Sequence, residues 1–153
     1  MSIYIAYGSN MDLGQMAYRC PNAKPLGKAI LKDWRLMFKS HFATIERQEG
    51  YNTPILFWEI DDKDERALDR YEGYPDFYYK MNVNFDDVTM FNAQAKVPTE
   101  GMVYIMHEHN DFKLPSMTYY QALVDAYKKF NFDMNILEDA LVYSDKKDSN
   151  KKA

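Results

Sequence analysis

The sequence has only one cysteine, Cys20, among its 153 residues. A single cysteine cannot form an intrachain disulfide, and such sparse usage is typical of a reducing compartment. No stretch approaches the roughly 18 apolar residues of a membrane-spanning helix. The N-terminus also lacks the basic segment and apolar core of a secretory signal. We therefore expect a soluble, cytoplasmic protein without a membrane partner.

Positive charge and histidine are also scarce. Lys and Arg number 19 against 23 Asp and Glu, which gives a net charge of −4, and there are three His. Nucleic-acid-binding proteins normally present a basic face, so we expect no nucleic-acid partner. His107 and His109 flank Glu108, but no third ligand has the spacing of a metal site. Gly8 lacks the glycine pattern of a phosphate-binding or dinucleotide-binding turn. We expect neither a metal nor a cofactor.

Aromatic residues, in contrast, are abundant, at 16% of the chain with 13 Tyr. Tyrosine suits the wall of a half-polar cavity, although most of the 13 are expected to fill sheet and surface positions. The length and the 46% hydrophobic content fit one domain with its own core.

Hydrophobic periodicity predicts an α+β fold with a single compact domain over residues 1–143 and a disordered polar tail over residues 144–153. The predicted strands are Ser2–Tyr7, Leu26–Lys39, Ala43–Glu46, Pro54–Ile60, Phe77–Phe85, Val88–Ala95 and Gly101–His107. The predicted helices are Asp12–Cys20, Asp62–Tyr71, Pro115–Phe130 and Asp133–Tyr143. Asp62 and Glu65 have the spacing of a capping box for the second helix, and Gly73 closes it. Phe77–Phe85 and Val88–Ala95 are expected to pair around Asp86-Asp87. Five to seven short strands with inserted helices predict one mixed sheet or a small barrel.

The stretch Tyr4–Met11 combines an apolar strand, a Gly-Ser-Asn turn and the start of a helix. This geometry can point several backbone N–H groups at one place, where they would bind an anion or a polarised carbonyl. Gly-Ser-Asn is also an ordinary turn composition, so the pattern alone leaves the role of the turn open.

Glu72 has an unusual position among the acidic residues. It lies one helical turn beyond Leu68 and beside Tyr71, so it shares an arc with the apolar face of its helix. It also lies at the C-terminal end, where the helix dipole disfavours a negative charge. Burial and the dipole would both raise its pKa toward that of a useful general base. A last-turn Glu that leans into solvent is the alternative.

Two side chains are candidate nucleophiles for an amide hydrolase, Ser9 and Cys20. Each would need a nearby base, and no spacing in the sequence supplies one. At the apolar end of a short helix, Cys20 fits a packed small hydrophobe better.

Three blocks of the sequence carry a family resemblance. Tyr4–Met11, with the sequence Tyr-Ile-Ala-Tyr-Gly-Ser-Asn-Met, resembles the signature of the gamma-glutamylcyclotransferase-like family, which includes gamma-glutamylamine cyclotransferase-like proteins. Ala67–Pro75, which leads into Tyr78-Tyr79-Lys80, is similar to the family's block in which a helix ends in the catalytic Glu-Gly. Leu114-Pro115-Ser116 and Tyr119 resemble the opening of its final helix. The resemblance extends from Ser2 to about Phe132.

The resemblance implies a compact fold built on a small mixed β-barrel with flanking helices. It also implies a cofactor-free, lyase-type cyclisation, in which the α-amine of a γ-glutamyl compound attacks its own γ-carbonyl and releases 5-oxoproline. Glu72 would be the general acid/base, and the Tyr7–Asn10 turn would hold the substrate and its oxyanion. The substrate-binding residues that it implies are Tyr4, Ile5, Ala6, Tyr7, Gly8, Ser9, Asn10, Tyr79 and Tyr119.

The partner expected from this resemblance is a small γ-glutamyl molecule, either an amino acid or an amine derivative of the kind found in glutathione metabolism. The chain itself would be a monomer or a homodimer. The alternative is a non-enzymatic ligand-binding or interaction module on the same scaffold, since a fold and its site can outlive an activity.

Overall fold

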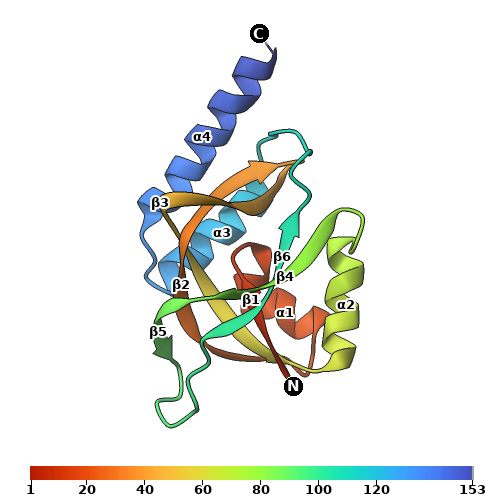
Figure 1. The fold of residues 1–153 in the computed structure, drawn as a ribbon, viewed down its shortest axis with the longest axis vertical. Coiled ribbons are helices and arrows are strands. Elements are labelled where there is room, and N and C mark those ends of the chain that lie inside the picture. Colours follow the sequence, from red (N-terminus) through yellow and green to blue (C-terminus); the bar gives the residue numbers. More distant parts are fainter. Residues whose placement is uncertain (153) are drawn as a thin grey trace.

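The computed structural model describes residues 1–152. The strands in this range are β1 (Ser2–Ala6), β2 (Lys24–Lys39), β3 (Phe42–Ile60), β4 (Tyr78–Asn84), β5 (Asp86–Met90) and β6 (Glu100–Met106). The helices are α1 (Leu13–Arg19), α2 (Asp62–Glu72), α3 (Met117–Lys129) and α4 (Met134–Lys152), with a short 3-10 helix, η1 (Ser9–Met11), before α1. Figure 1 shows these elements in chain order. The α+β class and the single domain are confirmed.

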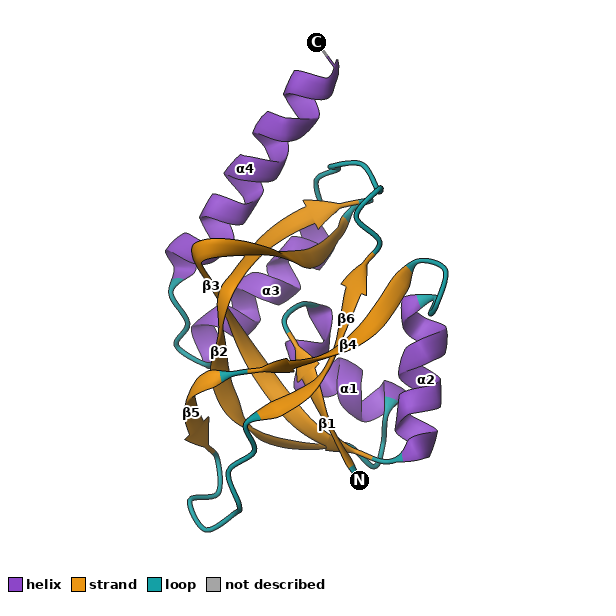
Figure 2. Ribbon diagram, viewed as in Figure 1, coloured by secondary structure: helices purple, strands orange, loops and turns teal. Residues whose placement is uncertain are grey.

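The six strands form one mixed sheet in the order β4-β6-β1-β3-β2-β5. Only β1 and β6 are parallel, and the other neighbours are antiparallel. The sheet is not closed into a barrel, which corrects the expected closure. It is nevertheless strongly curved, because the edge strands β4 and β5 are consecutive in the chain and only Phe85 separates them (Figure 2).

Two expected features of the strands are wrong. β4 pairs with β6 and β5 pairs with β2, so the two do not form the hairpin predicted around Asp86-Asp87. The predicted strands Ala43–Glu46 and Pro54–Ile60 belong to one long strand, β3, which pairs with β2 on both sides of a bulge at residues 48–51. The hairpin of β2 and β3 turns at Ser40 and His41, which both have positive φ.

The N-cap of α2 lies one residue earlier than predicted. Asp61 and Asp64 form the capping box, in place of the predicted pair Asp62 and Glu65. The helix ends at Glu72 because Gly73 takes a left-handed conformation with φ of 65°, and this predicted end is confirmed.

Helix α4 continues through residues 144–152 of the segment predicted to be a disordered tail, and residue 153 lies outside the described residues. Ser144 is fully buried, and its Oγ accepts a hydrogen bond of 2.8 Å from the backbone N–H of Phe38 on β2. Lys113 forms an ion pair with Asp148 at 3.4 Å. Ser144 thus joins this polar part of α4 to the sheet, and Asp148 joins it to the segment before α3. None of the described helices is both long and apolar enough to cross a membrane.

Candidate functional site

A cavity of about 140 Å³ lies where the ends of several elements meet. The turn after β1 contributes Tyr7, Gly8, Ser9 and Asn10, and the end of α2 contributes Glu72. Further lining side chains come from the start of β3, from β4 and β6, and from the first turn of α3. The two stretches singled out in the sequence, which lie about sixty residues apart, therefore face the same small space.

The N-terminal turn has the predicted strand–turn–helix form. The backbone N–H of Met11 donates to Gly8 and that of Asp12 to Ser9, each at 3.0 Å, which closes η1. The Asp12 carboxylate then caps α1 by accepting from the backbone of Gln15 at 3.0 Å. The chain consequently reverses within a few residues at the edge of the cavity.

The absence of a side chain at Gly8 admits the hydroxyl of Tyr119. A Cβ built at Gly8 would lie 3.1 Å from that oxygen. The Tyr119 oxygen accepts the backbone N–H of Ala43 at 3.1 Å and is also bonded by the backbone of Ser9. A tyrosine hydroxyl has two acceptor positions and one proton, so these contacts leave the proton free to donate into the cavity. Burial raises the pKa of Tyr119, so the phenol keeps this proton at neutral pH.

Three other tyrosine hydroxyls in the lining, those of Tyr7, Tyr78 and Tyr104, donate their protons to acceptors within the protein. Tyr7 donates to the backbone oxygen of Tyr104 at 2.7 Å, and Tyr78 donates to that of Ala43 at 2.9 Å. Tyr104 donates to the Asp69 carboxylate at 2.6 Å. These three rings form a fixed floor, because each hydroxyl is anchored to a different part of the fold.

Glu72 is half-buried at the last position of α2. Burial raises the pKa of Glu72 to about 7, and the positive charge of Arg19 opposes the rise. The predicted rise is thus present, with desolvation as its main cause. A carboxyl group with a pKa near 7 can both accept and return a proton under neutral conditions.

Arg19 joins the turn to α2. Its guanidinium carbon lies 3.4 Å from the centre of the Tyr71 ring, and the guanidinium donates to the side-chain oxygen of Asn10. The Asn10 amide in turn donates to the Tyr4 hydroxyl at 2.9 Å, and Ser9 Oγ lies 3.1 Å from the Tyr71 hydroxyl. The turn and the residue before Glu72 are therefore held together by side chains.

The family model described as "Gamma-glutamyl cyclotransferase, AIG2-like" matches residues 4–122, which include every residue of the cavity. The chain belongs to this family.

Solved structures support the same fold. A structure named gamma-glutamyl cyclotransferase has a TM-score of 0.75 at 20% identity, and an uncharacterized protein from Homo sapiens has 0.74 at 22%. Each alignment covers 91% of this chain and 85% of the other. A yeast gamma-glutamyl cyclotransferase specific to glutathione has a TM-score of 0.51 at 10% identity, covering 94% of this chain and 99% of the other. A comparison with curated protein sequences gives no match.

The structure brings most of the predicted site residues of this family together. Those that line the cavity are Tyr4, Ile5, Tyr7, Gly8, Ser9, Asn10, Glu72 and Tyr119. Ala6 is buried but is not part of the lining.

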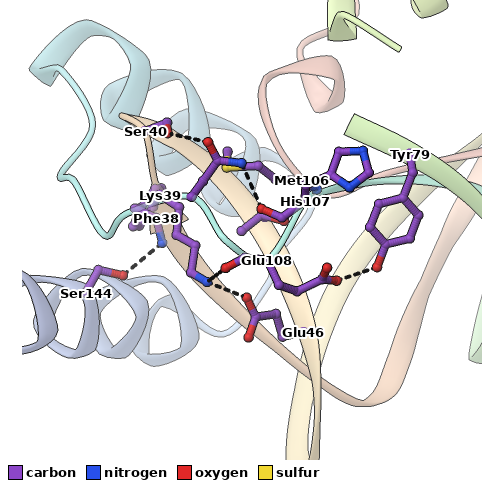
Figure 3. A network of polar contacts seen from close by, with 11 residues as sticks. Phe38, Lys39, Ser40, Glu46, Tyr79, Met106, His107, Glu108 and Ser144 are labelled. Carbon is purple, nitrogen blue, oxygen red and sulfur yellow. Dashed lines mark hydrogen bonds and ion pairs between the residues drawn. The ribbon is translucent and has the colours of Figure 1, made fainter. Parts of the chain in front are cut away.

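Tyr79 does not line the cavity either. On β4 the buried Tyr78 faces the cavity, and Tyr79 points to the other face. There its hydroxyl donates to the Glu108 carboxylate, next to the ion pair of Lys39 and Glu46 at 2.7 Å (Figure 3). Tyr79 therefore belongs to a separate polar network.

Several lining residues were not found from the sequence: Phe42, Ala43, Tyr71, Phe77, Tyr78 and Tyr104. Arg19, which contacts the lining, was also missed. Tyr71 and Tyr78 had a detectable signal, because Tyr71 directly precedes Glu72 and Tyr78 directly precedes Tyr79. Phe42 had none, since it falls in the gap between the predicted strands that end at Lys39 and begin at Ala43.

Within the described part of the chain, neither candidate nucleophile is hydrogen-bonded to a basic side chain. Cys20 lies outside the lining, and its thiol contacts the backbone oxygen of Asp64 at 3.7 Å. Burial raises the pKa of Cys20 to about 11, so the thiol stays protonated. Ser9 does line the cavity, but its hydroxyl pairs with that of Tyr71, and no histidine is among the lining residues. Within residues 1–152 no cluster of three or more His, Cys, Asp or Glu could hold a metal.

Proposed function

We propose that this protein is a γ-glutamyl cyclotransferase that converts a γ-glutamyl amine or amino acid into 5-oxoproline and the free amine. One observation carries this proposal. The Glu72 carboxylate, with its pKa raised to about 7, faces the same small cavity as the Gly8–Asn10 turn and the Tyr119 hydroxyl. Membership of the family supports the assignment.

The first step is removal of a proton from the substrate's α-ammonium group, because an ammonium has no lone pair with which to attack. Glu72 accepts this proton when its carboxyl group is ionised. The free amine then attacks the γ-carbonyl carbon of the same molecule and closes a five-membered ring. Since both reacting groups belong to one bound molecule, the cavity contributes chiefly by holding them in a reactive geometry.

The attack places a negative charge on the former carbonyl oxygen. The Tyr119 hydroxyl and backbone N–H groups of the Gly8–Asn10 turn are the donors that would stabilise it, and one such donor typically contributes about 3–4 kcal/mol. The intermediate collapses by breaking the bond between the carbonyl carbon and the leaving nitrogen. Glu72 returns its proton to that nitrogen and then takes the second proton of the new ring nitrogen. It passes this proton to the released amine, which leaves as an ammonium, so the carboxylate is restored after each turnover.

The test is release of 5-oxoproline from γ-glutamyl compounds by the purified protein and by Glu72→Gln. The substitution keeps the shape of the side chain and removes its basicity, so turnover should be lost while the folded structure is retained. Glu49→Gln is the matched control, because Glu49 is exposed on the β2–β3 hairpin and does not line the cavity. Full turnover by Glu72→Gln would contradict the mechanism.

A second measurement, of ligand binding, separates an enzyme from a binding module. Thermal-shift measurements with γ-glutamyl compounds and simple carboxylates should show selective stabilisation by the former. Equal stabilisation by both, together with no 5-oxoproline, would indicate a carboxylate-binding module on the same scaffold.

A further inference from the structure

We propose that the mouth of the cavity is a subsite for the leaving amine and that it selects an amine with a neutral aromatic body. The aromatic mouth consists of Phe42, Tyr71 and Phe77. This inference rests on the proposed function, since it concerns the group that leaves when 5-oxoproline forms.

The size of the cavity places the leaving group at the mouth. A volume of about 140 Å³ is close to the roughly 150 Å³ of an apolar cavity that takes up one benzene molecule. The γ-glutamyl group carries an ammonium, a carboxylate and the reacting carbonyl, and it fills a space of this order. Whatever is attached to the carbonyl must therefore extend outward, past the rim.

The exposure of the lining residues shows which side chains form that rim. Among the lining residues, Tyr4, Tyr7 and Asn10 are buried. Phe42 and Tyr71, in contrast, are 42% and 45% exposed, and Phe77 is half-buried. The two most exposed side chains of the lining are thus aromatic, and with the neighbouring Phe77 they offer flat apolar surface to a guest.

The rings of the mouth are fixed before any ligand arrives. Phe42 packs edge-on against Phe77 at 6.2 Å and against Tyr119 at 5.4 Å between ring centres. Tyr71 is held separately, by the Ser9 hydroxyl and by the guanidinium of Arg19. Rings that are already ordered lose little freedom on binding, and they favour an offset or edge-on contact with another ring.

The charge of the lining disfavours a leaving group with a carboxylate beside its nitrogen. The cavity is lined by no Lys, Arg or His, and Glu72 is its acidic side chain. Arg19 lies outside the lining and already contacts Tyr71 and Asn10. When an amino acid leaves, its carboxylate is one carbon from the scissile nitrogen, so it would be close to Glu72 and without a cation. An amine that lacks this carboxylate avoids the repulsion.

Four substrates separate the effect of the ring from that of the carboxylate: γ-glutamylphenethylamide, γ-glutamylphenylalanine, γ-glutamylethylamide and γ-glutamylalanine. Within this set, pairs differ by the phenyl ring alone or by the carboxylate alone. The phenethylamide should have the highest kcat/KM for 5-oxoproline release. We expect the ring to raise kcat/KM by about tenfold, as for a well-packed aromatic contact, and the carboxylate to lower it by about tenfold or more.

Substitutions at Phe42 test the location of the subsite. Phe42→Ala should remove most of the preference for phenethylamide over ethylamide. Phe42→Lys should relieve the penalty on γ-glutamylphenylalanine, because a lysine at this exposed position can hold its ammonium at the rim. Tyr18→Ala is the control, since Tyr18 is an aromatic side chain on α1 that is 92% exposed and does not line the cavity, and it should change neither ratio. Circular dichroism and Tm report whether each variant is folded.

The outcomes are distinguishable. If the wild-type protein releases 5-oxoproline but prefers γ-glutamylphenylalanine or γ-glutamylethylamide over the phenethylamide, the subsite is wrong and the proposed function stands. If none of the four compounds yields 5-oxoproline, the proposed function is contradicted and the subsite with it. The substrate comparison on the wild-type protein needs no variant, so a Phe42 variant that fails to fold leaves the test intact.

Discussion

Glu72 is the residue whose protonation state governs the proposed reaction. Burial raises the pKa of Glu72 to about 7, and the group acts as a base only when it is ionised. We therefore predict that kcat/KM for 5-oxoproline release rises with pH on the acid side with an apparent pKa near 7. A buffer series from pH 5 to 9 measures it. An acid limb centred near pH 4.5 would show that the catalytic group is an ordinary solvated carboxyl group.

The same shift predicts how stability depends on pH. A carboxyl group whose pKa is raised on folding favours the native state below its unfolded pKa, and this contribution is lost as pH rises through the folded pKa. Relative to Glu72→Gln, the wild-type protein should therefore lose up to about 3 kcal/mol of unfolding free energy between pH 4.5 and 7. Urea unfolding at pH 5 and pH 8 tests this, and a constant difference between the two proteins would contradict it.

Tyr119 supplies the hydroxyl donor that the proposed mechanism directs at the oxyanion. Its oxygen is held by the backbone of Ala43 and Ser9, so Tyr119→Phe removes the hydroxyl proton while the ring keeps its packing against Phe42. We predict a fall in kcat of about 10²–10³-fold with a smaller change in KM, as when one oxyanion donor is removed. Steady-state kinetics measure both constants. Loss confined to KM would assign Tyr119 to substrate binding alone.

At the scale of elements, α4 is fastened to the sheet through a side chain that looks unimportant in the sequence. Ser144→Ala would leave the buried backbone N–H of Phe38 without its acceptor. We predict a loss of about 1–3 kcal/mol of unfolding free energy. Ser149→Ala, at an exposed position of the same helix, is the control and should be near neutral. Equal stability of the two variants would show that α4 contributes little to the fold.

Helices and strands that are marked by a clear local sequence pattern could be predicted from the sequence. Which strands pair with one another was harder to predict. α2 and its end at Gly73 follow from the helical period and from a glycine that adopts positive φ. The separation of β4 from β5 depends on contacts with β6 and β2, which no local pattern contains. Tyr78 and Tyr79 are the same residue type, so composition could not tell which of the two faces the cavity.

The disposition of α4 shows the same limit. The second half of α4, from residue 144 on, lacks the apolar stripe by which a helix is recognised. The sequence therefore predicts disorder for this half. The hydrogen bond between the Phe38 backbone and Ser144 can form only in the folded chain, where β2 lies beside the helix. Likewise, the predicted part of the site was its two motifs, whereas the aromatic mouth comes from segments that only the folded chain brings together.

At the scale of the whole molecule, the curved sheet brings distant segments to one cavity. β1 lies between β3 and β6 in the sheet, so the turn that follows it is surrounded by the rest of the fold. The similarity to solved structures at 20–22% identity establishes this fold. The proposed activity depends instead on how Glu72, Tyr119 and the N-terminal turn are disposed within it.

A crystal structure with bound 5-oxoproline tests that disposition most directly. The ring nitrogen of the product is the former α-amine, and its ring carbonyl oxygen is the former γ-carbonyl oxygen. The account predicts 5-oxoproline in the cavity, with its nitrogen within hydrogen-bond reach of the Glu72 carboxylate and its ring carbonyl toward the Tyr119 hydroxyl. Product bound elsewhere, or bound with Glu72 turned into solvent, would contradict the central claim.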